Sequence, residues 1–259
     1  MKKLLFISLL AAFGFSNASA QDMKFGLFDH LGVGISLGTD GIGFDVAAPI
    51  TDWAAVRAGM SIMPKVKYND DYDIKSDSPT VTDEVNIEGK LNISDFKLLF
   101  DLYPIKSSSF HLTAGAFIGS KEVVKMYNTE MFITDPADYG MVGIMLGDHR
   151  FTSDEKGNVD ANIEVASFKP YLGIGFGRAV PKKGRVAVSC DLGVKFWGTP
   201  KFYSWERDTR YNKGEKGWLR YTDLKKQDID DDDADKFLDV MSKITIYPVL
   251  NIRISGRIF

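Results

Sequence analysis

Residues 243–259 read KITIYPVLNIRISGRIF, and this stretch decides the fold of the chain. Its apolar residues recur at every second position from Ile244 to Ile258, and polar residues such as Asn251 and Arg253 stand between them. This alternation is typical of a β-strand with one apolar and one polar face. Such a strand fits a membrane barrel, with lipid outside and a polar lumen inside. It also fits a soluble β-sandwich, with a core on one side and solvent on the other.

The first twenty residues are typical of a secretory signal peptide. Two lysines follow the first methionine, residues 4–15 form an apolar run, and an Ala-Ser-Ala cleavage site precedes Gln21. A membrane-spanning helix needs about 20 consecutive apolar residues, and no other stretch of the sequence is as apolar as this run. We therefore predict that residues 1–20 are removed and that residues 21–259 form a single exported domain.

Charge and cysteine content argue against a general nucleic-acid-binding protein and against a domain stabilised by disulfides. Removing the two lysines of the leader changes the net charge to (32 − 2) − 35 = −5, which is unsuited to general nucleic-acid binding. Cys190 is the single cysteine, so an internal disulfide is excluded. It shares the apolar face of its predicted strand, where a small apolar residue would serve equally well.

Seven further segments alternate in the same way, and turn residues separate them. These segments cover residues 31–37, 41–48, 53–63, 85–103, 110–118, 163–179 and 185–197. The fourth segment changes parity at Ser94-Asp95. Because one extra residue turns every later side chain to the other face, this change predicts a β-bulge.

The connections differ in length according to the end of the strands at which they lie. Tight turns are expected at Pro49, Pro104 and Pro181, and a short hairpin at Gly38, whereas residues 67–84, 127–161 and 198–242 are expected to form long polar loops. Short periplasmic turns and long external loops are the rule for outer-membrane barrels. We therefore predict an all-β fold: an antiparallel up-and-down transmembrane β-barrel of about eight strands with long extracellular loops.

The predicted inward face carries charges of both signs with glycines between them. Its members are Asp45, Arg57, Glu88, Lys90, Lys97, Asp101, His111, Lys169, Asp191, Lys195, Arg253 and Arg257. The interior of an eight-stranded barrel is just wide enough for side chains to fill it. Because an unpaired buried charge is costly, these groups are expected to form salt bridges that plug the lumen. A narrow ion path is the alternative.

Several segments resemble the small outer-membrane β-barrel proteins of Gram-negative bacteria, particularly the Bacteroides-type members. They are GVGISLGTDGIGFDVAAPITDWAAVRAG, KLLFDLYPIKSSSFHLTAGAFIG, FKPYLGIGFGRAVPKK and ITIYPVLNIRISGRIF. The OmpA-type membrane domain is similar in architecture, but nothing after the last strand resembles its peptidoglycan-binding domain. The resemblance implies assembly by the outer-membrane insertion machinery and assigns no chemistry. Phe259 departs from the usual C-terminal signal, because it is out of phase with Ile258.

Barrel enzymes that modify lipid A are similar in size, and they require a serine, a histidine base and an acid within hydrogen-bond reach. Of the three histidines, His111 faces inward beside a periplasmic turn, and His149 lies in an external loop beside Asp148 and close to Ser153. No recognisable motif surrounds either histidine. We therefore predict that the protein is not an enzyme and has no catalytic residues.

The acidic run DIDDDDADKFLD over residues 228–239 places Asp228, Asp230, Asp232 and Asp239 at positions one, three, five and twelve of a calcium-type loop. It lacks the glycine and the bidentate glutamate of an EF-hand loop. We expect a solvated loop that binds divalent cations weakly and could bridge to lipopolysaccharide phosphates. No other cofactor is expected.

Aromatic residues gather in the third long loop, mixed with basic residues. Tyr203 and Trp205 are explained by an interfacial girdle. Tyr211, Trp218 and Tyr221 lie farther from the strand and indicate a folded loop or an extracellular surface that binds sugar or protein.

The sequence therefore predicts a monomeric barrel in the outer membrane of a Gram-negative bacterium, with a role in envelope integrity or in binding extracellular partners through its loops. Its expected partners are outer-membrane lipid, lipopolysaccharide, the barrel assembly machinery and an extracellular ligand or protein, but not nucleic acid. Transport of small or apolar solutes through an OmpW-like barrel is the alternative function, and lipid-A modification is a third.

Overall fold

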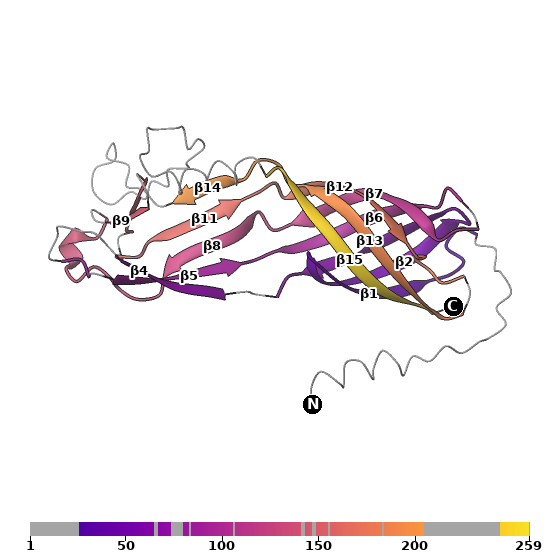
Figure 1. Ribbon diagram of the computed structural model, residues 1–259, viewed down its shortest axis with the longest axis horizontal. Helices are drawn as coiled ribbons and strands as arrows, with labels where there is room; N and C mark the ends of the chain where they lie inside the picture. Colours follow the sequence, from indigo (N-terminus) through magenta and orange to yellow (C-terminus); the bar gives the residue numbers. More distant parts are fainter. Residues whose placement is uncertain are drawn as a thin grey trace, which may run out of the picture.

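The computed structural model describes residues 26–258, except 65–66, 74–79, 83, 106, 141–142, 147–148, 155, 183 and 205–243. Apart from one short 3₁₀ helix, Pro136–Asp138, every regular element of this part is a strand (Figure 1). The all-β prediction is therefore confirmed. The predicted signal peptide, the acidic run and the loop aromatic residues Trp205, Tyr211, Trp218 and Tyr221 lie outside the described residues.

Eight strands close into an antiparallel barrel in the order β1-β15-β13-β12-β7-β6-β3-β2, which confirms the predicted fold class. These strands are β1 (Gly32–Gly38), β2 (Gly41–Thr51), β3 (Ala54–Ile62), β6 (Ser94–Leu102), β7 (Phe110–Gly119), β12 (Phe168–Phe176), β13 (Val186–Phe196) and β15 (Ile246–Arg257). The last strand of the sequence closes the barrel, because β15 pairs with both β13 and β1. The pairing of β15 with β1 leaves no free edge in this sheet.

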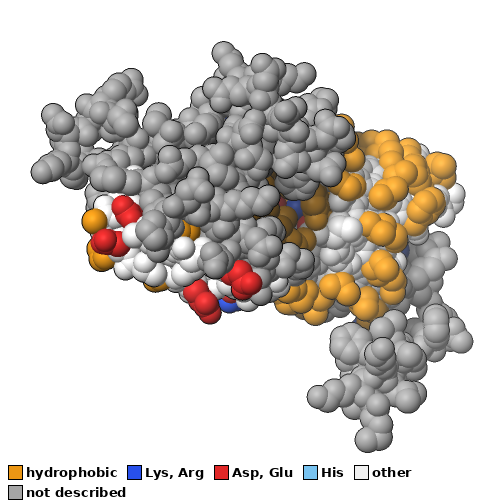
Figure 2. Space-filling view, turned by 60° about the vertical axis from the view of Figure 1, so that its left-hand side comes forward, with side chains coloured by type: hydrophobic (Ala, Val, Ile, Leu, Met, Phe, Trp, Pro, Cys, Tyr) orange, Lys and Arg blue, Asp and Glu red, His pale blue; other side chains and the backbone are white. Residues whose placement is uncertain are grey.

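Side chains on the barrel strands alternate between an apolar exterior and a polar interior. On β15, Ile252 and Ile254 are exposed and Arg253 between them is buried. The same pattern runs around the barrel, and orange side chains cover this part of the surface in Figure 2. An apolar outside around a polar inside is the side-chain distribution of a membrane-spanning barrel.

No helix among the described residues is long and apolar enough to cross a membrane.

A second sheet of five strands extends the barrel at one end (Figure 1). Its strands are β4 (Lys67–Asp73), β5 (Glu84–Leu91), β8 (Glu122–Asn128), β11 (Asp160–Glu164) and β14 (Lys201–Ser204), in the order β14-β11-β8-β5-β4. This order repeats that of the barrel strands β13-β12-β7-β6-β3, which they adjoin in sequence. The end of the barrel that carries this sheet is called the sheet end, and the opposite end, with its short connections, the turn end.

The long segments expected to be loops therefore contain regular structure, and this part of the prediction was wrong. Besides the five-stranded sheet, β9 (Gly143–Leu146) and β10 (His149–Thr152) form a small two-stranded sheet. The missed strands are short, or they are charged like β4, whose sequence is KYNDDYD. Such sequences show little of the apolar alternation that marks a strand.

The predicted fourth strand, residues 85–103, is two strands, β5 and β6, which belong to different sheets. Leu91 pairs with Val124 and Asp95 pairs with Gly119. Four residue steps on one strand (95 − 91) therefore face five on its neighbour (124 − 119), so the extra residue lies on the neighbouring strand. The predicted sixth strand, residues 163–179, is likewise divided into β11 and β12.

One face of the second sheet is apolar and packs around the axis of the extension. The neck cluster consists of Ile93, Val123, Ile163 and Val165, with Met63, Leu91, Val124 and Trp197 packed against it. Farther from the barrel, the distal cluster consists of Val85, Phe132, Ile133 and Val159. Trp197 also stacks on Tyr247, with 4.9 Å between ring centroids. Tyr247 in turn packs against the lumen cluster, Leu99, Phe117, Tyr171 and Val249, so apolar packing continues from the extension into the barrel.

Candidate functional site

The barrel interior holds a balanced set of buried charges. In the described part of the barrel they are the carboxylates of Asp40, Asp45, Asp95, Asp101 and Asp191, and the cationic groups of Arg57, Lys97, Lys169, Lys195 and Arg253. Five acids thus face five bases, and His111 is buried among them. A set of charges this well matched is what a narrow lumen without bulk water requires.

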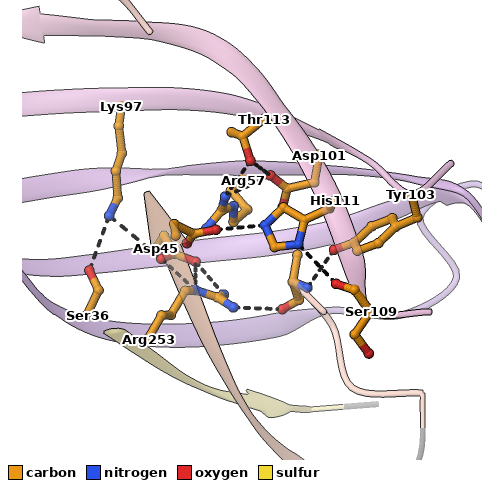
Figure 3. A network of polar contacts seen from close by, with 12 residues as sticks. Ser36, Asp45, Arg57, Lys97, Asp101, Tyr103, Ser109, His111, Thr113 and Arg253 are labelled. Atoms are coloured by element: carbon orange, nitrogen blue, oxygen red, sulfur yellow. Dashed lines mark hydrogen bonds and ion pairs between the residues drawn. The ribbon is translucent and has the colours of Figure 1, made fainter. Parts of the chain in front are cut away.

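Arg57 on β3 is the centre of the network toward the turn end (Figure 3). One guanidinium nitrogen donates to Asp101 at 2.7 Å, and the other donates to Asp191 at 2.9 Å. Thr113 donates its hydroxyl to the same Asp101 oxygen at 2.8 Å. These residues come from β3, β6, β7 and β13, so the contacts cross the lumen and tie its walls together.

His111 on β7 belongs to the same network. Its Nε2 lies 2.7 Å from Asp191, and its Nδ1 lies 3.3 Å from the backbone carbonyl oxygen of Ser109. A methyl group built on Gly175 would lie 2.5 Å from His111 Nε2, so the glycine makes room for the imidazole. Each ring nitrogen therefore lies within hydrogen-bond distance of an oxygen atom of the barrel, and these two contacts fix the orientation of the ring.

Arg253 on β15 links the middle of the lumen to the turn end. Its Nε donates to Asp45 at 2.9 Å, and one terminal nitrogen donates to the same carboxylate at 2.6 Å. The other terminal nitrogen donates to the carbonyl oxygen of Ala179 at 3.0 Å. The two-pronged contact with the carboxylate is the strong, directional arrangement that guanidinium groups favour.

A second ion cluster closes the lumen toward the sheet end. Asp95 accepts from Lys169 at 2.6 Å and from Lys195 at 3.1 Å. The ammonium group of Lys195 also lies 3.6 Å from Asp40 and 3.9 Å above the centre of the Phe117 ring. Asp40 stands in the tight β1–β2 hairpin, so that turn contributes a charge to the sheet end of the lumen.

Lys97 is the most loosely held cation of the lumen. Its ammonium group lies 3.4 Å from the hydroxyl of Ser36 and 3.9 Å from Asp45. It borders a cavity that has room for about one water molecule. Arg57, Asp191 and Arg253 also line this cavity, so its wall is polar and suits water.

The connection between β12 and β13 folds across the turn end. Ala179 and Val180 are buried there in the turn-end cluster with Ala47, Ala55 and Tyr103. The backbone N–H of Ala179 donates to the Tyr103 hydroxyl at 2.9 Å. Arg178 stacks on the Tyr103 ring, with 4.4 Å to its centre. This connection therefore covers the turn end of the lumen, where apolar packing and hydrogen bonds hold it in place.

Nine of the residues predicted for the lumen lie buried in the barrel. They are Asp45, Arg57, Lys97, Asp101, His111, Lys169, Asp191, Lys195 and Arg253. Arg257 lies at the rim of the turn end, where it donates to the carbonyl oxygen of Pro181 at 3.0 Å.

Glu88 and Lys90 do not lie in the lumen, which corrects the prediction. Both belong to β5 of the second sheet, on the face opposite Leu91. Glu88 accepts from Tyr127 and pairs with Lys67 at 3.0 Å. The hydrogen bond from Tyr127, followed by that from Lys67, lowers the pKa of Glu88 below its ordinary value. The sequence assigned these residues to the lumen because strand parity identifies a face but not what surrounds it.

Two charged lumen residues were missed, and each has a physical reason. Asp40 lies in a turn, where alternation gives no direction to a side chain. Asp95 lies at the parity change, which was attributed to a bulge in its own strand although the extra residue belongs to the neighbouring strand. Reading Asp95 in phase with Lys97 and Asp101 would have found it.

The remaining candidates lie elsewhere. Tyr203 is on β14 of the second sheet and pairs with Asn162. His149 is on β10. Cys190 is exposed on the apolar exterior. Tyr211, Trp218, Tyr221 and the four aspartates of the acidic run lie outside the described residues.

Comparison with known proteins gives a similarity of fold alone. No family model matches the chain, and no curated protein sequence matches it. Among solved structures, Acinetobacter baumannii CarO2 is 14% identical, with a TM-score of 0.46 over 91% of this chain and 99% of that one. Acinetobacter baumannii CarO is also 14% identical, with a TM-score of 0.45 over 87% of this chain and 96% of that one. We base the functional argument on the geometry of this chain.

Proposed function

We propose that the protein is an outer-membrane β-barrel whose lumen is closed, and that it anchors an extracellular β-sheet which serves envelope integrity or partner binding at the cell surface. The observation that carries the proposal is the pairing of buried charge across the lumen. The cavity that Lys97 and Arg57 border has room for about one water molecule, which favours a closed lumen.

Two groups of buried ion pairs support a closed lumen. One lies around Asp95 toward the sheet end and the other around Arg57 toward the turn end, and the lumen cluster and the turn-end cluster fill further space inside the barrel. An ion crossing the barrel would have to separate both groups of paired charges. Removing one partner from a buried pair costs about 3–5 kcal/mol, so spontaneous opening is rare.

The different connections at the two ends of the barrel indicate which end faces the periplasm and which faces the outside of the cell. At the turn end the connections are short, whereas the sheet end carries the second sheet and the connection between β14 and β15. In outer-membrane barrels the short turns face the periplasm and the long connections face outward. The second sheet is therefore extracellular in this proposal.

The proposal assigns the protein no catalytic role. His111, the histidine buried in the lumen, is held by Asp191 and by a backbone carbonyl oxygen, and the Ser109 group beside it is that carbonyl and not the hydroxyl. Among the described residues, no group of three or more His, Cys, Asp or Glu side chains is placed to hold a metal ion. Assembly by the barrel insertion machinery and a monomeric state complete the proposal.

Labelling of single cysteines on intact Gram-negative cells tests the assignment of sides. In a Cys190→Ser background, Glu130→Cys places a thiol on the exposed far part of the sheet end, and Ser107→Cys places one in an exposed turn at the other end. We expect a membrane-impermeant maleimide to label the cysteine at 130 and not the one at 107. Labelling of the cysteine at 107 alone would overturn the orientation, and labelling of both only after lysis would overturn surface display.

A further inference from the structure

The face of the second sheet that points away from the neck cluster carries a row of lysines. Lys67 on β4 pairs with Lys90 on β5, and Lys90 pairs with Lys125 on β8. The row continues through Asn162 on β11 to Tyr203 on β14. Direct cross-strand partners share a face, with Cβ atoms about 4.5–5.5 Å apart. We call these five residues the lysine row.

The lysine row lies just beyond the apolar exterior of the barrel, on the outward side of the same wall. Lys67 follows the exposed Ile62 by five positions, Lys90 precedes the exposed Phe96 by six, and Lys125 follows the exposed Ile118 by seven. At about 3.3 Å per residue and a tilt of about 35–45°, the row stands roughly 12–19 Å beyond that apolar edge. At the near end of that range, a lysine side chain that lies back along the sheet brings its ammonium group close to the headgroup region.

The charges of this row are only partly compensated within the described protein. Lys67 pairs with Glu88 at 3.0 Å. Lys90 and Lys125 make no salt bridge or side-chain hydrogen bond with any described group, and their described acidic neighbours are Glu88 for Lys90 and Asp160 for Lys125. Like charges directly opposite each other destabilise a sheet. An anion bound between the ammonium groups of Lys90 and Lys125 would reduce the repulsion between them.

We propose that the lysine row binds the phosphate groups of a phosphorylated glycolipid in the outer leaflet. This inference rests on the proposed function, because the outer leaflet must surround the base of the second sheet. Phosphates supply the negative charge, and lysine is a suitable partner for them as a point charge. Tyr203 adds an aromatic ring at the end of the row, where the face of a sugar ring would lie. The amide nitrogen of Asn162, between Lys125 and Tyr203, already donates to Glu122 at 3.1 Å.

Binding of lipid A to the full-length protein, refolded in a neutral detergent, tests the site. The informative variant is Lys90→Gln combined with Lys125→Gln, which leaves the Lys67–Glu88 pair intact. The matched control is Lys156→Gln combined with Arg185→Gln, which removes the same charge at exposed positions away from the row. Heat-modifiable gel mobility verifies folding of every sample.

We expect the Lys90/Lys125 variant to bind bisphosphorylated lipid A about tenfold more weakly than the wild type, because each lysine near an anionic surface contributes a several-fold factor. The control variant should bind like the wild type, and dephosphorylated lipid A should bind the wild type as weakly as the variant. Equal binding by the variant and the wild type would overturn the site. Inorganic phosphate that binds as tightly as lipid A would overturn the lipid as the source of the phosphate.

The outcome separates this inference from the proposed function, since binding in detergent does not depend on orientation in a cell. Loss of lipid A binding in the variant, together with periplasmic labelling of the second sheet, would refute the proposed sides and keep the anion site. Surface labelling without any effect of the variant would keep the proposed sides and refute the anion site.

Discussion

The barrel and the second sheet are built from neighbouring stretches of the same strands, yet their chemistry is inverted. Inside the barrel the wall presents Arg57, Asp101 and Lys169, and outside it presents apolar side chains. Beyond the barrel rim, Leu91 and Ile163 pack inward in the neck cluster, whereas the opposite face carries charged groups. Where lipid surrounds a sheet its charges lie inside, and where water surrounds it its apolar side chains lie inside.

This difference teaches that parity alone does not assign a role to a charged residue in such a chain. Glu88 and Asp101 both alternate with apolar neighbours, but the first lies on the outer face of the extension and the second in the lumen. Odd-numbered residues face inward along the whole stretch, from Leu91 in the neck cluster to Asp95 and Asp101 in the lumen, so the chemistry of the inward face changes at the barrel rim and its parity does not. A residue must be placed relative to that change before its surroundings are known.

The largest effect is expected from Arg57→Met in the barrel. The substitution leaves Asp101 and Asp191 buried without their shared cation, which should cost about 3–5 kcal/mol of unfolding free energy. Urea unfolding of the barrel in lipid vesicles measures the loss. Lys182→Met, which removes the partner of the partly exposed Asp52 at the turn end, is the control and should change stability by about 1 kcal/mol or less. Similar losses for both variants would contradict the idea that the lumen network carries stability.

In the second sheet the corresponding substitution removes apolar packing. Ile163→Ala empties part of the neck cluster and should cost the extension about 2–5 kcal/mol. We expect faster proteolysis and hydrogen exchange in β5, β8 and β11, with the heat-modifiable mobility of the barrel retained. A variant that loses the barrel together with the extension would show that the two regions unfold as one unit.

The same arginine introduced on the outer face of each region sharpens the contrast. Leu98→Arg places a charge on the lipid-facing side of β6, and it should cost about 2–4 kcal/mol near the middle of the membrane. Asn69→Arg on the outer face of β4 should stay within about 0.5 kcal/mol, because its side chain is exposed to water and lies opposite Glu88. The comparison is made by unfolding in vesicles. An equal cost at both positions would refute the inverted surroundings.

The smallest effect is a dependence of the second sheet on pH through Glu88. Because the pKa of Glu88 is lowered in the folded state by Tyr127 and Lys67, its contribution to stability is present above the ordinary value of 4.5 and is lost as the pH falls through the folded pKa. Protection of β5 and β8 in hydrogen exchange should therefore decrease in acid. The Glu88→Gln variant should lack this acid-dependent part, and an unchanged acid response in that variant would rule out Glu88 as its source.

The fold was largely predictable from the sequence, because a membrane barrel alternates strictly and its turns are short. The eight barrel strands each show that alternation, as Ile252, Arg253 and Ile254 do on β15. The second sheet was predicted only in part. Most of β5 and the end of β11 lie within predicted strands, whereas β4 and β14 were missed because they are highly charged or short. The sequence could not predict which lumen residues pair with each other. His111 and Asp191, for example, are 80 residues apart, and only the register of β7, β12 and β13 brings them together.

Single-channel recording of the refolded full-length protein in a planar bilayer tests the closed lumen most directly. Heat-modifiable gel mobility of the same sample establishes that the barrel has folded. The paired charges around Arg57 and Asp95 and the apolar layers between them predict a silent bilayer, without stepwise conductance, at any moderate voltage. Stable, reproducible conductance steps from the folded protein would contradict the closed lumen and identify the barrel as a channel.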